Sequence, residues 1–253
     1  MNSSTFSTIA LIFDFDDTLV PDSTTKLLKH YKIDPQKFWK KDAKALIYSG
    51  FDPALAYLKL LLENIGPRKP LGQLTNAELC KFGKTLDLLF YDGIPELIRD
   101  LKNTVKRYKN IAIEFYVISG GLQEIIEGSE LIKKNFSGVY GSQLVGDTKD
   151  GVLKYIKRCV TFTEKTRYLF EINKGLDPTR TRRNPYLVNK DIAPHNRKIP
   201  FKNMIFVGDG LTDIPCFSLL KKEGGTTFGV FDPGEKKSAK RALLEFLKTD
   251  RVI

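Results

Sequence analysis

Short runs of apolar residues, many of them β-branched or aromatic, recur along the chain and end in glycine or polar residues. The three clearest runs cover Ile9 to Asp16, Ile111 to Ser119 and Asn203 to Asp209. Gly138 to Leu144 and Thr226 to Phe231 are two further candidates. Such runs are typical of strands that are buried on both faces, as in a parallel sheet.

Segments with a helical spacing of apolar residues separate these predicted strands. Pro95 occupies a first-turn position and predicts a helix over Glu96 to Lys109. The same spacing predicts helices over Gln123 to Asn135 and over Glu235 to Lys248. Strands that alternate with helices predict an α/β fold, with a Rossmann-like three-layer core around a mainly parallel sheet.

A long segment between the first two predicted strands does not follow this alternation. It includes a helical pattern over Ala54 to Glu63 and a second helix that starts near Thr75 or Asn76, where either residue could act as the N-cap. We therefore expect an inserted helical cap domain. The predicted division is residues 1–20 and 92–253 for the core and residues 21–91 for the cap.

Two later segments also depart from the alternation. Gly141 to Cys159 predicts a small β-hairpin that turns at Thr148 to Gly151. Asp177 to Pro200 contains four prolines and little periodicity, and therefore predicts a long irregular segment before the third clear strand.

Composition limits the class of protein. The chain has 253 residues, of which 42% are apolar and 28% are charged, so a globular protein with one main core is expected. No apolar run approaches the roughly 20 residues that cross a bilayer.

The first residues carry no basic group, and Asp14 soon interrupts the first apolar run, which predicts a cytoplasmic protein without a secretory signal. The three cysteines lack CxxC spacing and favour reduced thiols over disulfides or zinc.

The chain is basic, with 41 Lys and Arg against 30 Asp and Glu, a net charge of +11. Such a charge is compatible with nucleic acids, acidic membrane surfaces or anionic metabolites, and does not choose among them. Its densest part is residues 174–202, with eight basic residues against two acidic ones. This segment could steer a phosphorylated substrate, contact a polyanion, or only solubilise the surface.

Reactive side chains follow the three clearest strands. Asp14 and Asp16 end the first, Ser119 ends the second, and Asp209 and Asp213 follow the third. In an open parallel sheet, functional groups gather beyond the carboxyl ends of the strands. Carboxylates brought together there would repel each other unless a cation neutralised them, and hard oxygen ligands of this kind suit Mg²⁺.

These motifs resemble those of the haloacid dehalogenase (HAD) superfamily, and the helical insertion resembles the cap of its phosphoserine-phosphatase-like subgroup. Asp14-Phe15-Asp16-Asp17-Thr18 matches the DxDxT first motif, and Ser119 matches the second. Gly208 to Asp213 matches the GDGxxD fourth motif. Lys165 opens a helical pattern and is preferred as the third motif, with Lys154 and Lys174 as competitors.

The resemblance implies a role for each matching residue. Asp14 would attack phosphorus and form an aspartyl-phosphate, and Asp16 would act as the general acid and then the general base. The acid/base Asp16 favours a phosphatase or a phosphomutase over a dehalogenase. The implied Mg²⁺ site comprises the Asp14 carboxylate, the Asp16 main-chain carbonyl and Asp209, with Asp213 nearby or acting through water. The implied phosphate site comprises Ser119, the Gly120 amide and Lys165.

The function that this resemblance implies is Mg²⁺-dependent hydrolysis of a small phosphorylated metabolite. A phosphomutase, and a catalytically weak polyanion-binding protein on the same fold, are the two alternatives. Nucleic acid is a less favoured partner than a small substrate, and a membrane is not expected. In the insertion, the pair Phe38-Trp39 favours a place in the cap core over a stacking surface.

Overall fold

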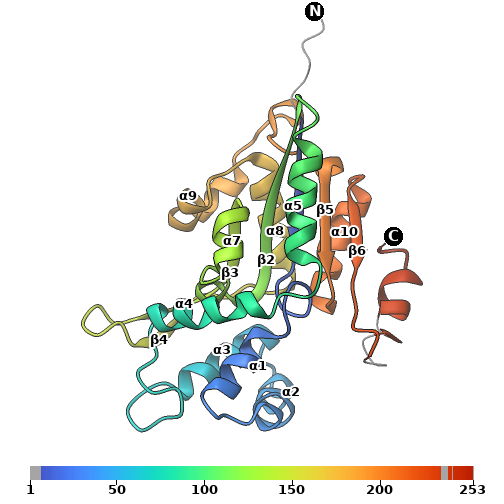
Figure 1. Ribbon diagram of the computed structural model, residues 1–253. Helices are drawn as coiled ribbons and strands as arrows, with labels where there is room; N and C mark the ends of the chain where they lie inside the picture. Colours follow the sequence, from blue (N-terminus) through green and yellow to red (C-terminus); the bar gives the residue numbers. More distant parts are fainter. Residues whose placement is uncertain (1–6, 235–238, 241, 253) are drawn as a thin grey trace, which may run out of the picture.

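The computed structural model describes residues 7–234, 239–240 and 242–252. Six strands form one sheet in the order β4-β3-β2-β1-β5-β6 (Figure 1). Only the β3–β4 pair is antiparallel among the pairs of this sheet. The sheet confirms the predicted α/β class and all five predicted strands. The strands are β1 (Ser7–Phe13), β2 (Ile111–Leu122), β3 (Gly138–Gly146), β4 (Leu153–Arg158), β5 (Met204–Gly208) and β6 (Thr226–Gly229).

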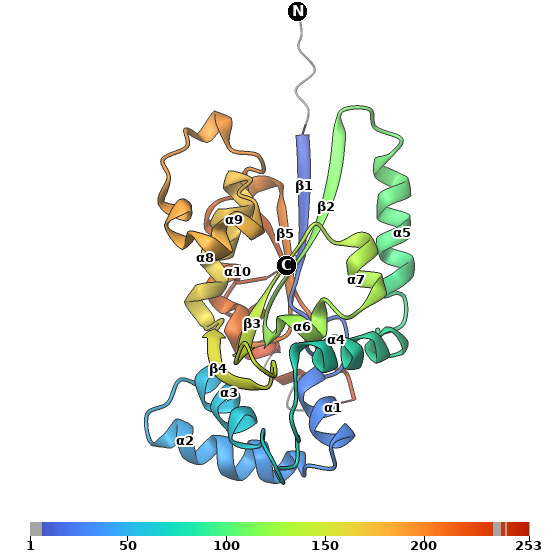
Figure 2. The ribbon, with the colours of Figure 1, turned by 90° about the vertical axis from the view of Figure 1, so that its left-hand side faces the viewer.

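Alternating side chains of the central strand β1 serve two separate cores, which gives the protein three layers (Figure 2). Leu11 and Phe13 join the core on one face, and Ala10 and Ile12 join the core on the other. Because both faces are covered, the strand is apolar at successive positions. The covering helices are α5 (Ile94–Val105) and α7 (Glu130–Asn135) on the first face, and α8 (Phe162–Lys174) and α10 (Ile214–Lys222) on the second.

The segment between β1 and β2 is helical, as predicted, and its first three helices lie beyond the carboxyl ends of the strands (Figures 1 and 2). Thr75 is the N-cap of the fourth helix and forms a capping box with Glu78, whose side chain accepts from the Thr75 amide at 2.7 Å. The exact division of cap and core stays a prediction. The helices are α1 (Ser23–His30), α2 (Lys44–Tyr48), α3 (Pro53–Glu63) and α4 (Asn76–Thr85), with a π-helical segment at Lys37–Ala43.

The expectation of one helix over Gln123 to Asn135 is wrong. The structure has two short helices, α6 (Gln123–Ile126) and α7, with a break at Gly128 and Ser129. Ser129 caps α7 by accepting from the Ile132 amide at 3.2 Å, and α4 packs closely against α6 at the break. A tertiary contact therefore outweighs the local helical pattern.

The segment Asp177 to Pro200 is more regular than expected. Asp177 caps a short helix, α9 (Pro178–Arg183), and two 3₁₀ turns follow at Pro185–Asn189 and Pro194–Asn196. The predicted hairpin is confirmed by the antiparallel pair of β3 and β4, whose connection contains Gly151 at φ 70°.

The last predicted helix, Glu235 to Lys248, falls partly outside the described residues, because 235–238 and 241 are not among them. Its described part contains a π-helical segment at Ala242–Leu247. In the part of the chain that the structure describes, no helix has both the length and the apolar character that crossing a membrane requires.

The contact between α4 and α6 gives a first prediction, for Gly83→Ala. A Cβ at Gly83 would lie 1.9 Å from the Ile125 carbonyl oxygen and 3.0 Å from the Gly128 Cα atom. Helix propensity alone predicts a gain of up to about 1 kcal/mol, whereas overpacking costs about 1–3 kcal/mol. We expect a net loss in the free energy of unfolding, measured by chemical denaturation. Lys84→Ala, at an exposed position of the same helix, is the control, and a stabilised Gly83→Ala would refute the packing argument.

Candidate active site

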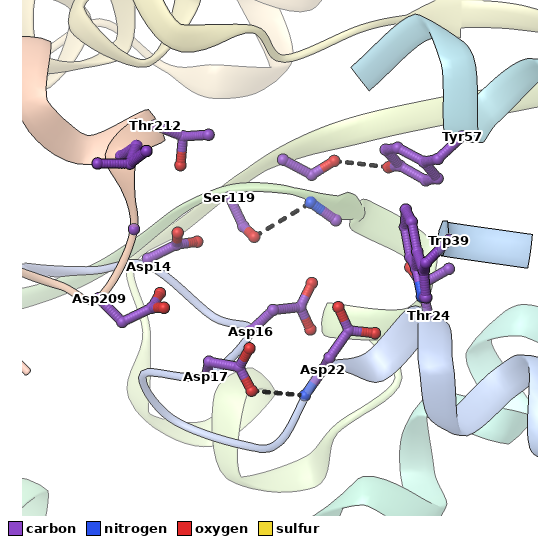
Figure 3. Close-up of a pocket in the computed structure, with 14 residues that line it drawn as sticks. Asp14, Asp16, Asp17, Asp22, Thr24, Trp39, Tyr57, Ser119, Asp209 and Thr212 are labelled. Atoms are coloured by element: carbon purple, nitrogen blue, oxygen red, sulfur yellow. Dashed lines mark hydrogen bonds between the residues drawn. The ribbon is translucent and has the colours of Figure 1, made fainter. Parts of the chain in front are cut away.

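A cavity of about 390 Å³ lies at the carboxyl ends of β1, β2 and β5 (Figure 3). The strand ends contribute Asp14, Asp16, Ser119, Gly120 and Asp209 to its lining. This placement follows from the topology, because β1 pairs in parallel with both β2 and β5. The chain leaves three adjacent strands at the same edge of the sheet, and side chains from distant parts of the sequence meet there.

The Lys165 side chain bridges two carboxylates in the interior. Its Nζ donates to Asp14 Oδ2 at 2.7 Å and to Asp213 Oδ1 at 2.7 Å, and the Lys165 side chain is 1% exposed. The second Asp14 oxygen, Oδ1, accepts from the Phe15 amide at 2.7 Å. Burial alone would lower the pKa of Lys165, but Asp14 and Asp213 outweigh that effect and raise the pKa above its usual value. Lys165 is therefore a fixed cation behind Asp14.

The two competing lysines have other partners. Lys154 pairs with Asp147 within the hairpin, and both side chains are exposed. Lys174 donates to the Val188 carbonyl at 2.6 Å and to the Lys190 carbonyl at 2.8 Å. Of the three lysines considered, the structure brings only Lys165 to Asp14.

The Asp16 carboxyl group is half-buried and points into the cavity (Figure 3). Its Oδ1 accepts from the Ser23 amide at 2.7 Å. Burial, followed by the charge of Asp22, raises the pKa of Asp16 well above its usual value and so shifts this group toward its neutral form. Across from it, a Cβ at Gly121 would lie only 2.6 Å from Asp16 Oδ2, so a larger residue here would push the carboxyl group from its present position.

The end of β2 is held by hydroxyl groups from two other elements. The Gly120 carbonyl accepts from the Tyr57 hydroxyl at 2.6 Å and from Ser142 Oγ at 2.9 Å. Ser119 Oγ accepts from the Gly121 amide at 3.1 Å. Burial raises the pKa of Tyr57 above its usual value, so the hydroxyl stays a donor. Because Tyr57 lies on α3, this contact ties the helical insertion to the strand end beside the cavity.

Three carboxylates are close enough to share one cation. Oxygen atoms of Asp14, Asp209 and Asp213 lie within 4.8 Å of one another. Asp213 is the most enclosed: its Oδ1 accepts from Lys165, and its Oδ2 accepts from the Gly210 amide at 3.0 Å. Burial raises the pKa of Asp213 to about 6, against the opposing effect of Lys165. Carboxylate oxygens at this spacing fit a hard divalent cation such as Mg²⁺.

Sequence reasoning missed the wall of the cavity that the insertion provides. Asp22, Thr24, Trp39 and Tyr57 all line the cavity. Phe38 is buried in the core, as expected, and Trp39 packs half-buried against the same core and also lines the cavity, which the sequence did not indicate. These residues belong to no motif, and only the fold of the insertion brings them together.

The basic segment 174–202 contributes no residue to the lining of this cavity. Several of its cations have structural partners. Arg182 binds Glu127 and the Val139 carbonyl, and Lys198 binds Glu114. These contacts favour an anchoring role for these two cations over direct contact with a ligand in the cavity.

No protein-family model matches the chain. A protein of Borreliella burgdorferi, described only as an uncharacterized protein, is 28% identical over 263 residues, which cover 94% of this chain and 87% of that protein. This relative carries no stated activity.

Solved structures define the fold. A HAD family hydrolase from Salmonella enterica serovar Typhi matches 83% of this chain with a TM-score of 0.54 and 14% identity. A structure described as a "probable phosphoserine phosphatase" from Vibrio cholerae matches 93% of this chain with a TM-score of 0.52 and 12% identity. This chain spans 58% of the first protein and 61% of the second. The chain has the fold of the HAD superfamily.

The buried bridge gives a second prediction, for Lys165→Met. This substitution leaves the Asp14 and Asp213 carboxylates buried without their cation. Breaking a buried ion pair by removing one partner costs about 3–5 kcal/mol, and we expect a loss of that size in the free energy of unfolding, measured by chemical denaturation in the presence of a chelator. Lys154→Met breaks an exposed pair and is the matched control, for which we expect little change. Equal effects of the two substitutions would contradict the argument.

Proposed function

We propose that the protein is a Mg²⁺-dependent phosphomonoester hydrolase that acts on a small phosphorylated metabolite through an aspartyl-phosphate. The observation that carries this proposal is the position of Asp14 and Asp16 on one cavity, with Asp14 fixed by Lys165 at 2.7 Å. A carboxylate nucleophile beside a carboxyl group with a raised pKa suits a two-step displacement at phosphorus. The HAD fold supports the same assignment by analogy.

In the first step, the Asp14 carboxylate attacks phosphorus and the bond from phosphorus to the leaving oxygen breaks. Asp16 gives its proton to that oxygen, which leaves as an alcohol. In the second step, Asp16 accepts a proton from the water molecule that attacks the aspartyl-phosphate. Inorganic phosphate leaves, and Asp14 is regenerated as a carboxylate.

The other residues of the site hold the charges in place. Asp14, Asp209 and the Asp16 main-chain carbonyl would hold Mg²⁺, with Asp213 close by or linked through water. When bound, Mg²⁺ offsets the repulsion between the carboxylate nucleophile and the phosphate. Ser119 and the Gly120 amide would bind phosphoryl oxygens, Lys165 would add its positive charge from behind Asp14, and residues 21–91 would act as the cap over them.

The proposal predicts that Asp14→Asn abolishes phosphate release. The amide cannot act as the nucleophile, so we expect kcat to fall by at least about 1,000-fold. The measurement is phosphate release from p-nitrophenyl phosphate and from a panel of phosphorylated metabolites, with Mg²⁺ and with chelator. Asp34→Asn, on the insertion but away from the cavity, is the matched control. Phosphate release that survives in Asp14→Asn would refute the proposed nucleophile. A folded protein that releases no phosphate from any substrate would favour the phosphomutase or the polyanion-binding alternative.

A further prediction separates the role of Asp16 from that of Asp14. Asp16→Asn removes the proton donor, so substrates with poor alkyl leaving groups should lose kcat by about 100-fold or more. p-Nitrophenyl phosphate, whose leaving group needs little protonation, should lose much less in the first step. The measurement is the rate constant for release of the alcohol under single-turnover conditions, compared between an alkyl and an aryl ester. Equal losses for both esters would remove the acid role from Asp16.

A further inference from the structure

The wall of the cavity opposite Asp14 comes from the helical insertion. Asp22, Thr24, Trp39 and Tyr57 form it. In Figure 3, Trp39 and Thr24 lie across the cavity from Asp14, and the Asp22 carboxylate points up beside that of Asp16. Because the phosphoryl group would bind at the strand ends, this wall is the surface that the alcohol part of a substrate would contact.

The charge on the cavity lining is of one sign. Among the described residues that line the cavity, five are aspartates and none is lysine, arginine or histidine. Lys165 lies behind Asp14, and its ammonium group is already shared between Asp14 and Asp213. A leaving group with a carboxylate or a second phosphate would therefore face the aspartates of the lining and would find no cationic side chain there to pair with. Such an unpaired negative charge is costly in a partly buried site.

Trp39 adds an aromatic surface to this acidic wall. Its indole Nε1 donates to Thr25 Oγ1 at 2.8 Å, and its ring packs against the Phe38 ring at 5.0 Å and the Tyr57 ring at 5.9 Å. These contacts fix the ring on the cavity wall. The face of a tryptophan ring attracts ammonium groups, most strongly when water is excluded. An aromatic ring and a carboxylate on the same wall of a cavity are a combination that suits an organic cation.

Asp22 is held in place as well. Its carboxylate is the N-cap of α1 and accepts from the Thr25 amide. Thr25 therefore links the two residues, since its amide donates to Asp22 and its hydroxyl accepts from Trp39. The carboxylate and the aromatic ring are parts of one preorganised structure, and such preorganisation favours selective binding.

We infer that the substrate is the phosphate monoester of a small amino alcohol, whose primary or quaternary ammonium group binds between Asp22 and Trp39. This inference rests on the proposed function and adds the class of its leaving group. It excludes phosphorylated acids, phosphoserine among them, as preferred substrates, because their carboxylate has no basic partner on the described lining of the cavity.

The test compares esters that differ in charge. The alcohol part is cationic in ethanolamine phosphate and choline phosphate and uncharged in glycerol 3-phosphate. Phosphoserine has the structure of ethanolamine phosphate with an added carboxylate. For the unmodified protein with Mg²⁺, we expect kcat/KM for the two cationic esters to exceed that for the other two by at least about tenfold. A preference for phosphoserine or glycerol 3-phosphate, with p-nitrophenyl phosphate hydrolysed, would overturn the substrate class alone. Loss of all hydrolysis, p-nitrophenyl phosphate included, would overturn the proposed function and this inference with it.

Two variants test whether Asp22 and Trp39 cause the preference for cationic esters. Asp22→Asn removes the charge but keeps an oxygen that can cap α1, and we expect it to lower the ratio of kcat/KM for ethanolamine phosphate over glycerol 3-phosphate by about tenfold. Trp39→Leu should lower the corresponding ratio for choline phosphate by about fivefold. Asp34→Asn removes one exposed charge from the same insertion and should leave both ratios unchanged. Unchanged ratios in both Asp22→Asn and Trp39→Leu would overturn the assignment.

Discussion

The structure of the site depends on one buried ionic bridge, in which Lys165 holds Asp14 and Asp213 at 2.7 Å each. Three charges in the interior are tolerated only when each has a partner, because burial of an unpaired charge is expensive. The three residues come from the end of β1, from α8 and from the turn before α10, so the bridge forms only when these elements have packed on the sheet. The same interaction that closes this part of the core also orients the Asp14 carboxylate.

Close approach of the main chain makes room for these carboxylates. A Cβ at Gly208 would lie 2.4 Å from Asp213 Oδ2, and one at Gly121 would lie 2.6 Å from Asp16 Oδ2. Seven other glycines in the described part of the chain have a positive φ, but Gly121 and Gly208 do not, so lack of space and not backbone conformation explains glycine at these two positions. The carboxylates can therefore sit against the strand ends, where main-chain amides and Lys165 stabilise them.

The sequence pattern predicted the strands and the residues that follow them. Strands buried on both faces must be apolar, and polar residues at their carboxyl ends must meet at one edge, so the places of Asp14 and Asp209 followed from the pattern. The break at Gly128 and the exposure of Trp39 to the cavity could not be predicted in this way. Both depend on how the helical insertion packs on the core, through the contact of Gly83 with Gly128 and the contacts of Tyr57, and no periodicity along the chain encodes such contacts.

The two walls of the cavity are therefore under different constraints. The wall at the strand ends is fixed by the sheet and by the buried bridge, and a change there affects stability as well as chemistry. The opposite wall belongs to the helical insertion, which packs on the core through buried apolar side chains and through the hydrogen bond from Tyr57 to the Gly120 carbonyl. Through that bond, the position of α3 is coupled to the end of β2, which would bind phosphate. A leaving group that fits against Trp39 and Tyr57 would stabilise the same arrangement of α3 that holds Gly120 in place, so recognition of the alcohol and binding of the phosphate would reinforce each other.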